Sequence, residues 1–389
     1  MNDRTVLIDT YVDDIHAIAV KWALQRAGAN CFLLYGDDFP THQQITLRPS
    51  ERMEVAFTAR DQQFTVTSKQ SLAYWCRRRS GPVISEEVHP ADQRVALREA
   101  NAMLSSVRVL LSAFPDCFTI NPLVGRNRGT SKAFQLWAAA QSGLNIPPTV
   151  MSNSHAEVDN FLRSSSERKL YKPFNPAYWL DEEFSRGFCT FATSITADSL
   201  PPPEALIHSP GIYQPYVDKS YEVRVVVMGA SFFATRLDSQ QSPESSEDWR
   251  TLAGRIPQST IEVPPDVRLA CLRFMERCDL LFGCFDFIVG HDARWIFLEC
   301  NEQGQWLWQE DACPHLKLLD AFTQFILSGD RTFDYKPSAT PPTFGEFVFS
   351  DDYQNRQVEW EQHTRTPVPF RSIEPKSDRH PPTFNGMAS

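Results

Sequence analysis

The sequence lacks the features that mark secreted, membrane-spanning and dinucleotide-binding proteins. Its start, MNDRTVLID, carries an acid and no apolar signal region, and no later run approaches the ~20 apolar residues of a membrane span. The nine cysteines are scattered without a C-x-x-C pair, which argues against zinc ligation or a disulfide framework and for reduced core thiols. No internal repeat and no G-x-G-x-x-G turn occur. We therefore expect a cytoplasmic protein with no membrane partner.

Basic residues are also scarce. The 389 residues include 48 acidic and 38 basic side chains, for a net charge of −10. This balance disfavours nonspecific binding to nucleic acid, so we expect no nucleic-acid partner. The length allows two or three domains with a sizeable core. A protein of this charge that handles phosphates must concentrate its basic groups locally.

The most informative stretch runs from Cys284 to Glu310. Two short runs rich in aromatic and β-branched residues, Cys284–Val289 and Trp295–Cys300, are separated by a Gly-His-Asp turn. This pattern predicts a β-hairpin. Acidic side chains interrupt both of its strands.

These acidic side chains form a candidate metal site. Because side chains alternate along a strand, Glu299 and Asn301 share one face, and Asp286 on the partner strand can lie opposite them. Two carboxylates and an amide are hard oxygen ligands, the kind that hold Mg²⁺ together with substrate phosphates. Acids inside apolar strands are costly unless they are paired or metal-bound. The alternative is a solvent-facing strand edge.

The N-terminal part resembles the opening of an open α/β domain. A strand at Val6–Ile8, a helix capped by Asp13 or Asp14 and a strand at Cys31–Tyr35 form a β-α-β unit. Short alternating segments between residues 45 and 67 predict antiparallel strands. A long helix follows over Pro90–Phe114, and its predicted inner face consists of Ala96, Leu97, Ala100, Met103, Leu104, Val107 and Leu111.

A basic cluster, Arg77 to Arg79, directly follows an aromatic strand in the segment Leu72–Arg79. One interpretation is a contact surface for an acidic peptide, since a guanidinium group can bind a carboxylate through two parallel hydrogen bonds. The other is a solvated strand end. The sequence does not separate the two.

Two lysines are candidates for binding phosphate. After a strand at Cys117–Ile120 and a predicted polar turn, GRNRGTSK, a helix begins with Thr130 or Ser131 as its cap. Lys132 therefore lies at a helix N-terminus, which favours anions; a plain surface lysine is the alternative. Lys172 lies in a strand that reads as buried, where an unpaired lysine is rare, and is the better candidate.

The remaining chain alternates strands and helices before its composition changes. Segment Gly211–Val217 is extended, and in the next strand Glu222 and Arg224 share one face, which suggests a site wall or a surface ion pair. A helix is predicted over Val267–Leu280, with Leu269, Leu272, Phe274, Met275 and Cys278 toward the core, and another over Leu316–Leu327. From Asp330 prolines multiply and apolar residues thin out, so we expect an extended or disordered appendage.

This order of parts resembles the ATP-grasp carboxylate–amine ligases, and more closely the graspetide synthetases, which macrocyclise ribosomal peptides of the microviridin type. The resemblance covers about residues 4–328 and rests on YWCRR, NP…SKAFQLWAAAQSGLNIPPT, QPYVDKSYEVRVVVMG, DSQ, DWR and FLECNEQGQWLWQE. It implies an α/β (α+β) protein with an ATP-grasp fold. The implied units are a pre-ATP-grasp domain with a leader or partner surface, a central subdomain, a C-terminal subdomain with the metal site and a flexible tail, at residues 1–122, 123–205, 206–330 and 331–389.

The resemblance also implies a set of site residues, together with ATP and two Mg²⁺ ions. Lys132 and Lys172 would hold the ATP phosphates. The adenine would be read by the backbone around Gln214, Tyr216 and Val217, with Lys219 and Glu222 in the same nucleotide site. Asp286, Glu299 and Asn301 would bind the metal, and Arg224 and Arg250 would stabilise the phosphoryl group and the acyl phosphate. Substrate contacts would come from Arg77, Arg78, Ser239 and Gln240.

The implied activity is a two-step ligation on a precursor peptide with a leader, performed by a homodimer. A side-chain carboxylate is phosphorylated, and a Ser/Thr hydroxyl or Lys amine then closes an ester or amide ring. Two features depart from the family: the run Asn301-Glu302-Gln303-Gly304-Gln305 replaces the usual Asn-Pro-Asn-Gly-Gln, and the tail is long.

Several alternatives stay open at this point. The chain could join free amino acids or extend a protein tail, or it could be an inactive nucleotide-binding scaffold. The segment Trp306–Trp308 could wall a peptide channel or belong to the core. The tail could be an attached substrate, because it contains Thr364, Thr366, Ser377 and Asp378.

Overall fold

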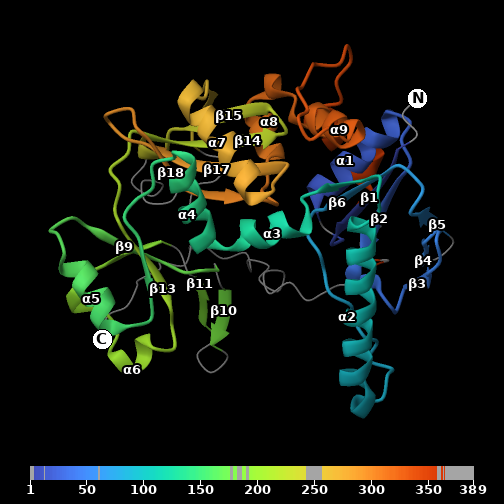
Figure 1. Ribbon diagram of the computed structural model, residues 1–389, viewed down its shortest axis with the longest axis horizontal. Coiled ribbons are helices and arrows are strands. Elements are labelled where there is room, and N and C mark those ends of the chain that lie inside the picture. Colours follow the sequence, from blue (N-terminus) through green and yellow to red (C-terminus); the bar gives the residue numbers. More distant parts are fainter. Residues whose placement is uncertain are drawn as a thin grey trace, which may run out of the picture.

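The structure is a computed structural model that describes residues 4–12, 14–59, 62–175, 178–181, 186–189, 192–241, 256–356, 361 and 363. An N-terminal α/β unit lies at one end, and two further sheets follow it along the chain (Figure 1). Within these residues, no helix combines the length and the apolar character needed to cross a membrane.

The N-terminal unit is a parallel sheet of four strands in the order β2-β1-β6-β7. The strands are β1 (Thr5–Thr10), β2 (Cys31–Tyr35), β6 (Leu72–Cys76) and β7 (Cys117–Ile120). Helix α1 (Ile15–Arg26), capped by Asp14, packs on one face, and α2 (Pro90–Ser112) packs on the other. The predicted β-α-β unit is confirmed.

A small antiparallel meander of β3 (Gln43–Arg48), β4 (Glu54–Ala59) and β5 (Gln62–Thr67) completes the α2 side of this unit. This confirms the prediction for residues 45 to 67. The inner face of α2 is shorter than predicted, because Ala100, Leu104, Val107 and Leu111 are buried whereas Leu97 is 41% exposed. One end of α2 projects away from the sheet in Figure 1, so its first turns have little to pack against.

The second sheet has the order β12-β9-β13-β8. Its strands are β8 (Val150–Ser152), β9 (Lys169–Lys172), β12 (Thr193–Ile195) and β13 (Gly211–Pro215). Helices α5 (His155–Arg163) and α6 (Pro203–Leu206) enclose a small core with it, and β10 (Tyr178–Asp181) and β11 (Arg186–Cys189) form a separate hairpin. Because β13 pairs with β8 and β9, this sheet continues to Pro215, beyond the boundary expected at residue 205.

The third sheet is antiparallel, with the order β16-β15-β14-β17-β18. Its strands are β14 (Tyr221–Met228), β15 (Ser231–Leu237), β16 (Gln258–Thr260), β17 (Phe282–Val289) and β18 (Trp295–Asn301). Helices α4 (Lys132–Ser142) and α7 (Pro265–Cys278) cover one face. The buried stripe of α7 includes Ala270 and Cys271, whereas Leu269 is 48% exposed, contrary to prediction, because the small side chains face the sheet.

The segment GRNRGTSK is not the polar turn that its composition predicts. Residues Leu123–Thr130 form helix α3, and Ser131 separates it from α4 and caps that helix. Two glycines let α3 approach its neighbours closely: a Cβ on Gly125 would collide with the carbonyl oxygen of Asp279, and one on Gly129 would crowd Glu302. The glycines that read as turn residues are packing residues here.

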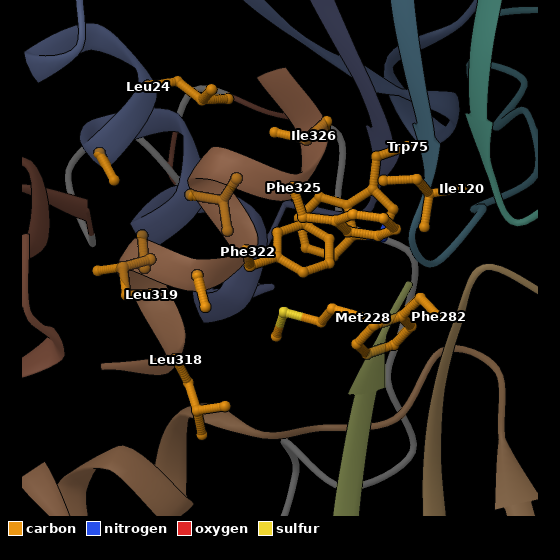
Figure 2. Packing of buried hydrophobic residues seen from close by; sticks show 14 of the residues in the cluster. Leu24, Trp75, Ile120, Met228, Phe282, Leu318, Leu319, Phe322, Phe325 and Ile326 are labelled. Atoms are coloured by element: carbon orange, nitrogen blue, oxygen red, sulfur yellow. The ribbon is translucent and has the colours of Figure 1, made fainter. Parts of the chain in front are cut away.

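One core joins the N-terminal unit to the third sheet (Figure 2). The Trp75 ring of β6 lies 4.5 Å from the Phe322 ring of α9 (Leu318–Ser328), and Met228 and Phe282 lie beside them. Trp306 is fully buried and stacks on Phe322 at 5.2 Å. Trp306 and the almost equally buried Leu307, which begins α8 (Leu307–Ala312), are therefore core residues, which decides between the two alternatives for both.

The proline-rich C-terminal segment is not wholly the extended appendage that its composition predicts. Helices α10 (Phe344–Val348) and α11 (Asp351–Gln354) fold back onto α1 and α8. Phe347 is fully buried against Trp22, with ring centroids 5.7 Å apart. Farther along, His363 Nδ1 contacts Asp38 Oδ2 at 2.5 Å. The tail residues considered as an attached substrate, Thr364, Thr366, Ser377 and Asp378, lie outside the described residues.

We expect the docked segment to contribute to stability through Phe347. Replacing Phe347 by Ala should lower the free energy of unfolding by at least about 3 kcal/mol, because it empties a closed apolar site. Phe349, two residues later, is 86% exposed. Phe349→Ala is therefore the matched control and should change stability by less than about 0.5 kcal/mol in the same urea titration. Equal effects of the two variants would contradict the docking.

Candidate metal and nucleotide site

The acidic hairpin forms as its sequence predicts. Strands β17 and β18 pair with Asp286 directly opposite Glu299, and the register shifts by one residue just beyond this pair. The Asn301 side-chain amide donates to Asp286 Oδ2 at 3.2 Å and to Glu299 Oε1 at 3.3 Å. The structure therefore brings the three predicted metal ligands together on one face of the sheet.

Two cations lie against these carboxylates. Arg224 of β14 is the cross-strand partner of Asp286, and its Nη1 donates to both Asp286 carboxylate oxygens at 2.7 Å. Both side chains are more than nine-tenths buried. Burial acts to lower the pKa of the Arg224 guanidinium, but the Asp286 carboxylate overcomes this effect and the pKa is raised. Arg224 is thus a permanent buried cation and not part of a surface ion pair.

Lys132 supplies the second cation. It is the first residue of α4, and its Nζ lies 3.3 Å from Glu299 Oε2. Ser131, one of the two predicted caps, accepts a hydrogen bond from Phe134 N. The helix N-terminus, the ammonium group and the carboxylate thus meet at one point, which argues against a plain surface lysine. A phosphate placed there would meet Lys132 and the positive end of α4.

The donor set fits a magnesium ion. Asp286, Glu299 and Asn301 offer carboxylate and amide oxygens on one face, and Mg²⁺ binds through one or two carboxylates plus phosphate oxygens. No group of three or more His, Cys, Asp or Glu side chains suited to a metal occurs among the described residues. That finding is compatible with this site, since the third ligand here is an amide.

The loop after the metal strand is held from the N-terminal unit. Arg77 is fully buried, and its Nη1 donates to the carbonyl oxygens of Gln303 and Gly304. Its Nε lies 3.0 Å from Asp14 Oδ2. A Cβ on Gly304 would collide with Cys284, so only glycine fits this turn. Arg77 therefore ties α1 to the loop next to Asn301.

The prediction that Arg77 belongs to a peptide-contact surface is thus wrong, because no part of its side chain is accessible. Arg78 is half-buried, and its Nη1 donates to Tyr11 Oη at 3.3 Å. Arg79 is exposed. Three identical residues in a row carry no signal that would distinguish the buried one.

Two further residues, neither of them predicted from the sequence, hold the same loop and complete what we call the clamp: the contacts of Arg77, Asn121 and His16 with the backbone between Glu302 and Leu307. Asn121 Nδ2 donates to the carbonyl oxygens of Phe282 and Glu302 at 2.8 and 2.9 Å. His16 Nε2 accepts from the backbone N–H groups of Trp306 and Leu307 at 2.9 and 3.1 Å. A helical histidine facing apolar neighbours gives no sequence signal for this role.

His16 predicts a specific pH dependence of stability. Burial, followed by the charge of Arg77, lowers the pKa of His16 to about 4, below an unfolded value of about 6.5. Between these values the unfolded chain binds a proton that the folded chain does not, so stability falls as the pH is lowered. This group should cost up to roughly 3 kcal/mol between pH 6.5 and pH 4.

The check is urea denaturation at pH 7, 6 and 5. His16→Gln keeps an acceptor for the two N–H groups but cannot be protonated, so its stability should depend less steeply on pH than that of the wild type. Asp14 also lies against His16; burial acts to raise its pKa, but the charge of Arg77 holds this pKa below its usual range, so Asp14 should stay ionised between pH 7 and pH 5 in both proteins. Parallel pH profiles for the two proteins would contradict the assignment.

The residues expected to bind nucleotide lie on the second sheet and on the connection to β14. Lys172 ends β9 and is half-buried, less than its sequence predicts. Gln214 is buried in β13, and its Nε2 donates to Thr149 Oγ1 at 2.9 Å. The backbone N–H of Tyr216 donates to the carbonyl oxygen of Arg168 at 2.7 Å. The backbone N–H of Val217 makes no hydrogen bond with any described residue.

The last predicted residues fall into three groups. Lys219 and Glu222 are both buried and form an ion pair of 2.7 Å. Ser239 is fully buried in a 3₁₀ turn at Ser239–Gln241, whereas its neighbour Gln240 is exposed. Of these two predicted substrate contacts, Gln240 is therefore the accessible one. Arg250 lies outside the described residues.

Comparison with known proteins agrees with this architecture. A family model described as the MvdD pre-ATP grasp domain matches residues 5–126. No curated protein sequence matches the chain. Among solved structures, a RiPP-associated ATP-grasp ligase of Chryseobacterium gregarium, in complex with ADP and a leader and core peptide, superposes with a TM-score of 0.74 at 21% identity, covering 84% of this chain and 96% of that one.

Two further solved structures are similar over nearly their whole lengths. The macrocyclase MdnC of Microcystis aeruginosa, bound to its precursor peptide MdnA, has a TM-score of 0.72 at 24% identity and covers 83% of this chain and 99% of its own. The ATP-grasp ligase PsnB, complexed with a precursor variant, Mg and ADP, has a TM-score of 0.62 at 18% identity, covering 85% and 99%. The protein is therefore of the mixed α/β class and has an ATP-grasp fold, preceded in the chain by a pre-ATP-grasp domain.

Proposed function

We propose that this chain is an ATP-dependent ligase that activates Asp or Glu side chains of a ribosomal precursor peptide and closes ester or amide rings. The observation that carries the proposal is the convergence of Asp286, Glu299 and Asn301 with Arg224 and Lys132 on one face of the third sheet. Similar solved structures contain precursor peptides and nucleotide, which supports this substrate class.

In this proposal ATP binds between the second and third sheets. Lys132 and Lys172 contact its phosphates, and the backbone around Gln214, Tyr216 and Val217 reads the adenine; the N–H of Val217, which donates to no described residue, is available for this contact. Asp286, Glu299 and Asn301 hold Mg²⁺, two ions by the family resemblance. When bound, Mg²⁺ supplies charge neutralisation at the phosphate oxygens.

The reaction proceeds in two steps. A carboxylate oxygen of the peptide takes the γ-phosphoryl group of ATP, and ADP leaves. A Thr or Ser hydroxyl, or a Lys amine, then attacks the acyl carbon, its proton is lost and phosphate leaves. Arg224, together with Arg250, stabilises the negative charge in both steps, so catalysis is positioning and charge stabilisation without a protein nucleophile.

The test is incubation of the full chain with ATP, Mg²⁺ and the small Thr/Ser- and Asp/Glu-rich peptide encoded in a neighbouring reading frame, followed by intact-mass measurement. Loss of one water per ring, with matching ADP release, is the expected result. A gain of one amino-acid residue would instead identify a ligase that joins free amino acids. Nucleotide binding with neither mass change nor ADP release would identify a scaffold.

The proposal includes the organisation of the molecule. We divide it into a pre-ATP-grasp domain at residues 1–122, a central subdomain that extends to Pro215, and a C-terminal subdomain that carries the metal face; the separate sheets support this division. We also propose a homodimer, to be tested by sedimentation. Cytoplasmic localisation is supported by the eight cysteines whose side chains the structure describes, which are free thiols.

A further inference from the structure

One buried guanidinium outside the metal site has no counter-ion among the described residues. Arg126 of α3 is only 7% exposed, and its Nη1 donates to Cys76 Sγ at 2.8 Å. In the amide orientation that satisfies both ends of Gln303, its oxygen accepts from Arg126 Nε and Nη2 at 3.2 and 2.7 Å. Within the part of the chain that the structure describes, no carboxylate lies within 4.0 Å of Arg126.

The partners of Arg126 are neutral. Burial raises the pKa of the Cys76 thiol to about 11, so the group stays protonated at neutral pH. Glu302 makes no hydrogen bond or ion pair with Arg126 among the contacts of the described residues. A buried charge that meets only neutral groups is costly unless an anion joins it.

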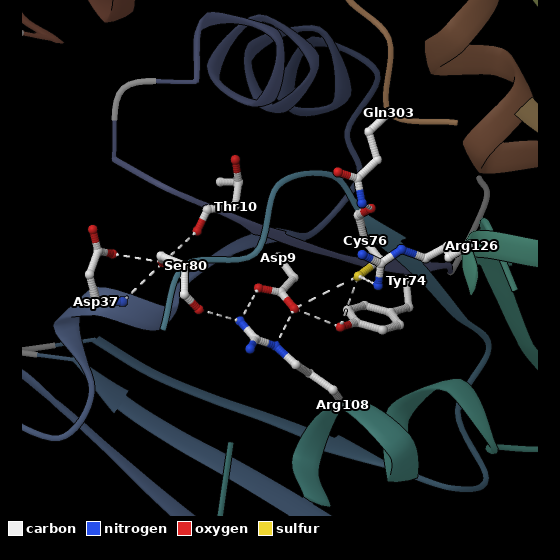
Figure 3. A network of polar contacts seen from close by, with 9 residues as sticks. All are labelled: Asp9, Thr10, Asp37, Tyr74, Cys76, Ser80, Arg108, Arg126 and Gln303. Carbon is white, nitrogen blue, oxygen red and sulfur yellow. Dashed lines mark hydrogen bonds and ion pairs between the residues drawn. The ribbon is translucent and has the colours of Figure 1, made fainter. Parts of the chain in front are cut away.

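Arg126 borders a cavity of about 100 Å³ that contains no acidic side chain in its lining. Three arginines line it: Arg79, Arg108 and Arg126. Among contacts between described residues, Arg108 alone of the three pairs with a carboxylate, through two hydrogen bonds to Asp9 of 2.7 and 2.9 Å. Figure 3 shows Cys76 and Tyr74 between this Asp9–Arg108 pair and Arg126. The cavity is therefore a positively charged enclosure.

The cavity lies on the α2 side of the parallel sheet, among β6, β7, α2 and α3. Tyr74 and Cys76 of β6 and Arg108 and Val109 of α2 are part of its lining, whereas no residue of β1 is.

We propose that this cavity binds a carboxylate carried on a short aliphatic stem. The guanidinium of Arg126 would pair with the carboxylate in a fork, and the stem would lie against Val109 and Leu123, which line the cavity and are 52% and 40% exposed. A free short-chain acid and an Asp or Glu side chain of a peptide share this chemistry. The site goes beyond the proposed ligation and stands without it.

Binding of a carboxylate in this cavity would affect the candidate metal site through one residue, Gln303. Gln303 accepts from Arg126 and follows Asn301 by two positions, and its carbonyl oxygen accepts from Arg77. An anion that fixes Arg126 would therefore also fix the loop beside the metal ligands. The proposed site is thereby placed to couple ligand binding to order in this loop.

The test is thermal unfolding of the full chain without nucleotide, titrated with sodium butyrate against sodium chloride at equal ionic strength. A ligand that binds only the folded state raises the unfolding temperature in a saturable way. We expect such a rise with butyrate and its loss in Arg126→Met. The matched control is Arg128→Met, because Arg128 lies exposed on the same helix and should leave the response unchanged. No rise beyond that of chloride would overturn the proposal.

Two further arms keep the test decisive. If Arg126→Met does not fold, Arg79→Met replaces it; Arg79 is exposed at the cavity, and its loss should raise the half-saturating butyrate concentration several-fold. An equal response to inorganic phosphate would overturn carboxylate selectivity. Glutamate blocked at both backbone ends, compared with blocked glutamine, separates the two sources. A response to blocked glutamate supports a peptide side chain, and a response to butyrate alone supports a free acid.

Discussion

Replacing Glu299 by Gln is expected to lower peptide-dependent ADP release by at least about 100-fold while leaving the fold intact. The amide keeps the shape of the side chain but removes the negative charge that would bind Mg²⁺ beside the phosphates. The ion pair lost with it, to Lys132, is partly exposed, with side-chain exposures of 29% and 23%. Such pairs contribute about 1 kcal/mol at most, so the unfolding temperature should change little.

The neighbouring acid should behave differently. Asp286 is paired with Arg224 inside the protein, so Asp286→Asn would leave a buried cation uncompensated and cost about 3–5 kcal/mol as well as activity. Glu299 is therefore the cleaner probe. Glu276→Gln, an exposed change on α7, is the control and should retain full ADP release. Full activity in Glu299→Gln would remove the metal assignment, and with it the proposed ligation.

Replacing Arg77 by Met should lower the free energy of unfolding by about 3–5 kcal/mol. The variant leaves the buried Asp14 carboxylate without its cation and the carbonyl oxygens of Gln303 and Gly304 without their donor. Desolvation acts to raise the pKa of Asp14, but Arg77 and His16 outweigh it and hold this pKa well below its usual range. The measurement is urea denaturation at pH 7.

The same arginine run supplies the control for this prediction. Arg79→Met removes an identical side chain two residues later, at an exposed position, and should change stability by less than about 0.5 kcal/mol. The sign of the pH effect adds a second check. Asp14 contributes stability above its unfolded pKa and loses it as the pH falls toward its lower folded pKa, so the difference between wild type and Arg77→Met should shrink in acid. Similar losses in both arginine variants would contradict the clamp.

The elements and the metal face could be predicted from local pattern. Alternation along β18 places Glu299 and Asn301 on one face, and the short turn to β17 brings Asp286 opposite them, whatever the rest of the chain does. Helix α3 could not be predicted in this way. Its glycines and polar residues favour a turn locally, and the helix depends on close contacts with Asp279 and Glu302, which are distant in sequence.

The sequence by itself determined elements such as α1 and β18, and the gathering of acids on one hairpin, because these depend on the spacing of side chains along a single element. The tertiary structure alone decided which of three adjacent arginines is buried, and which of two nearby phenylalanines, Phe347 or Phe349, enters the core. Both outcomes depend on a partner from a distant segment. Arg77 is buried because it forms an ion pair with Asp14, and Phe347 is buried because it packs against Trp22.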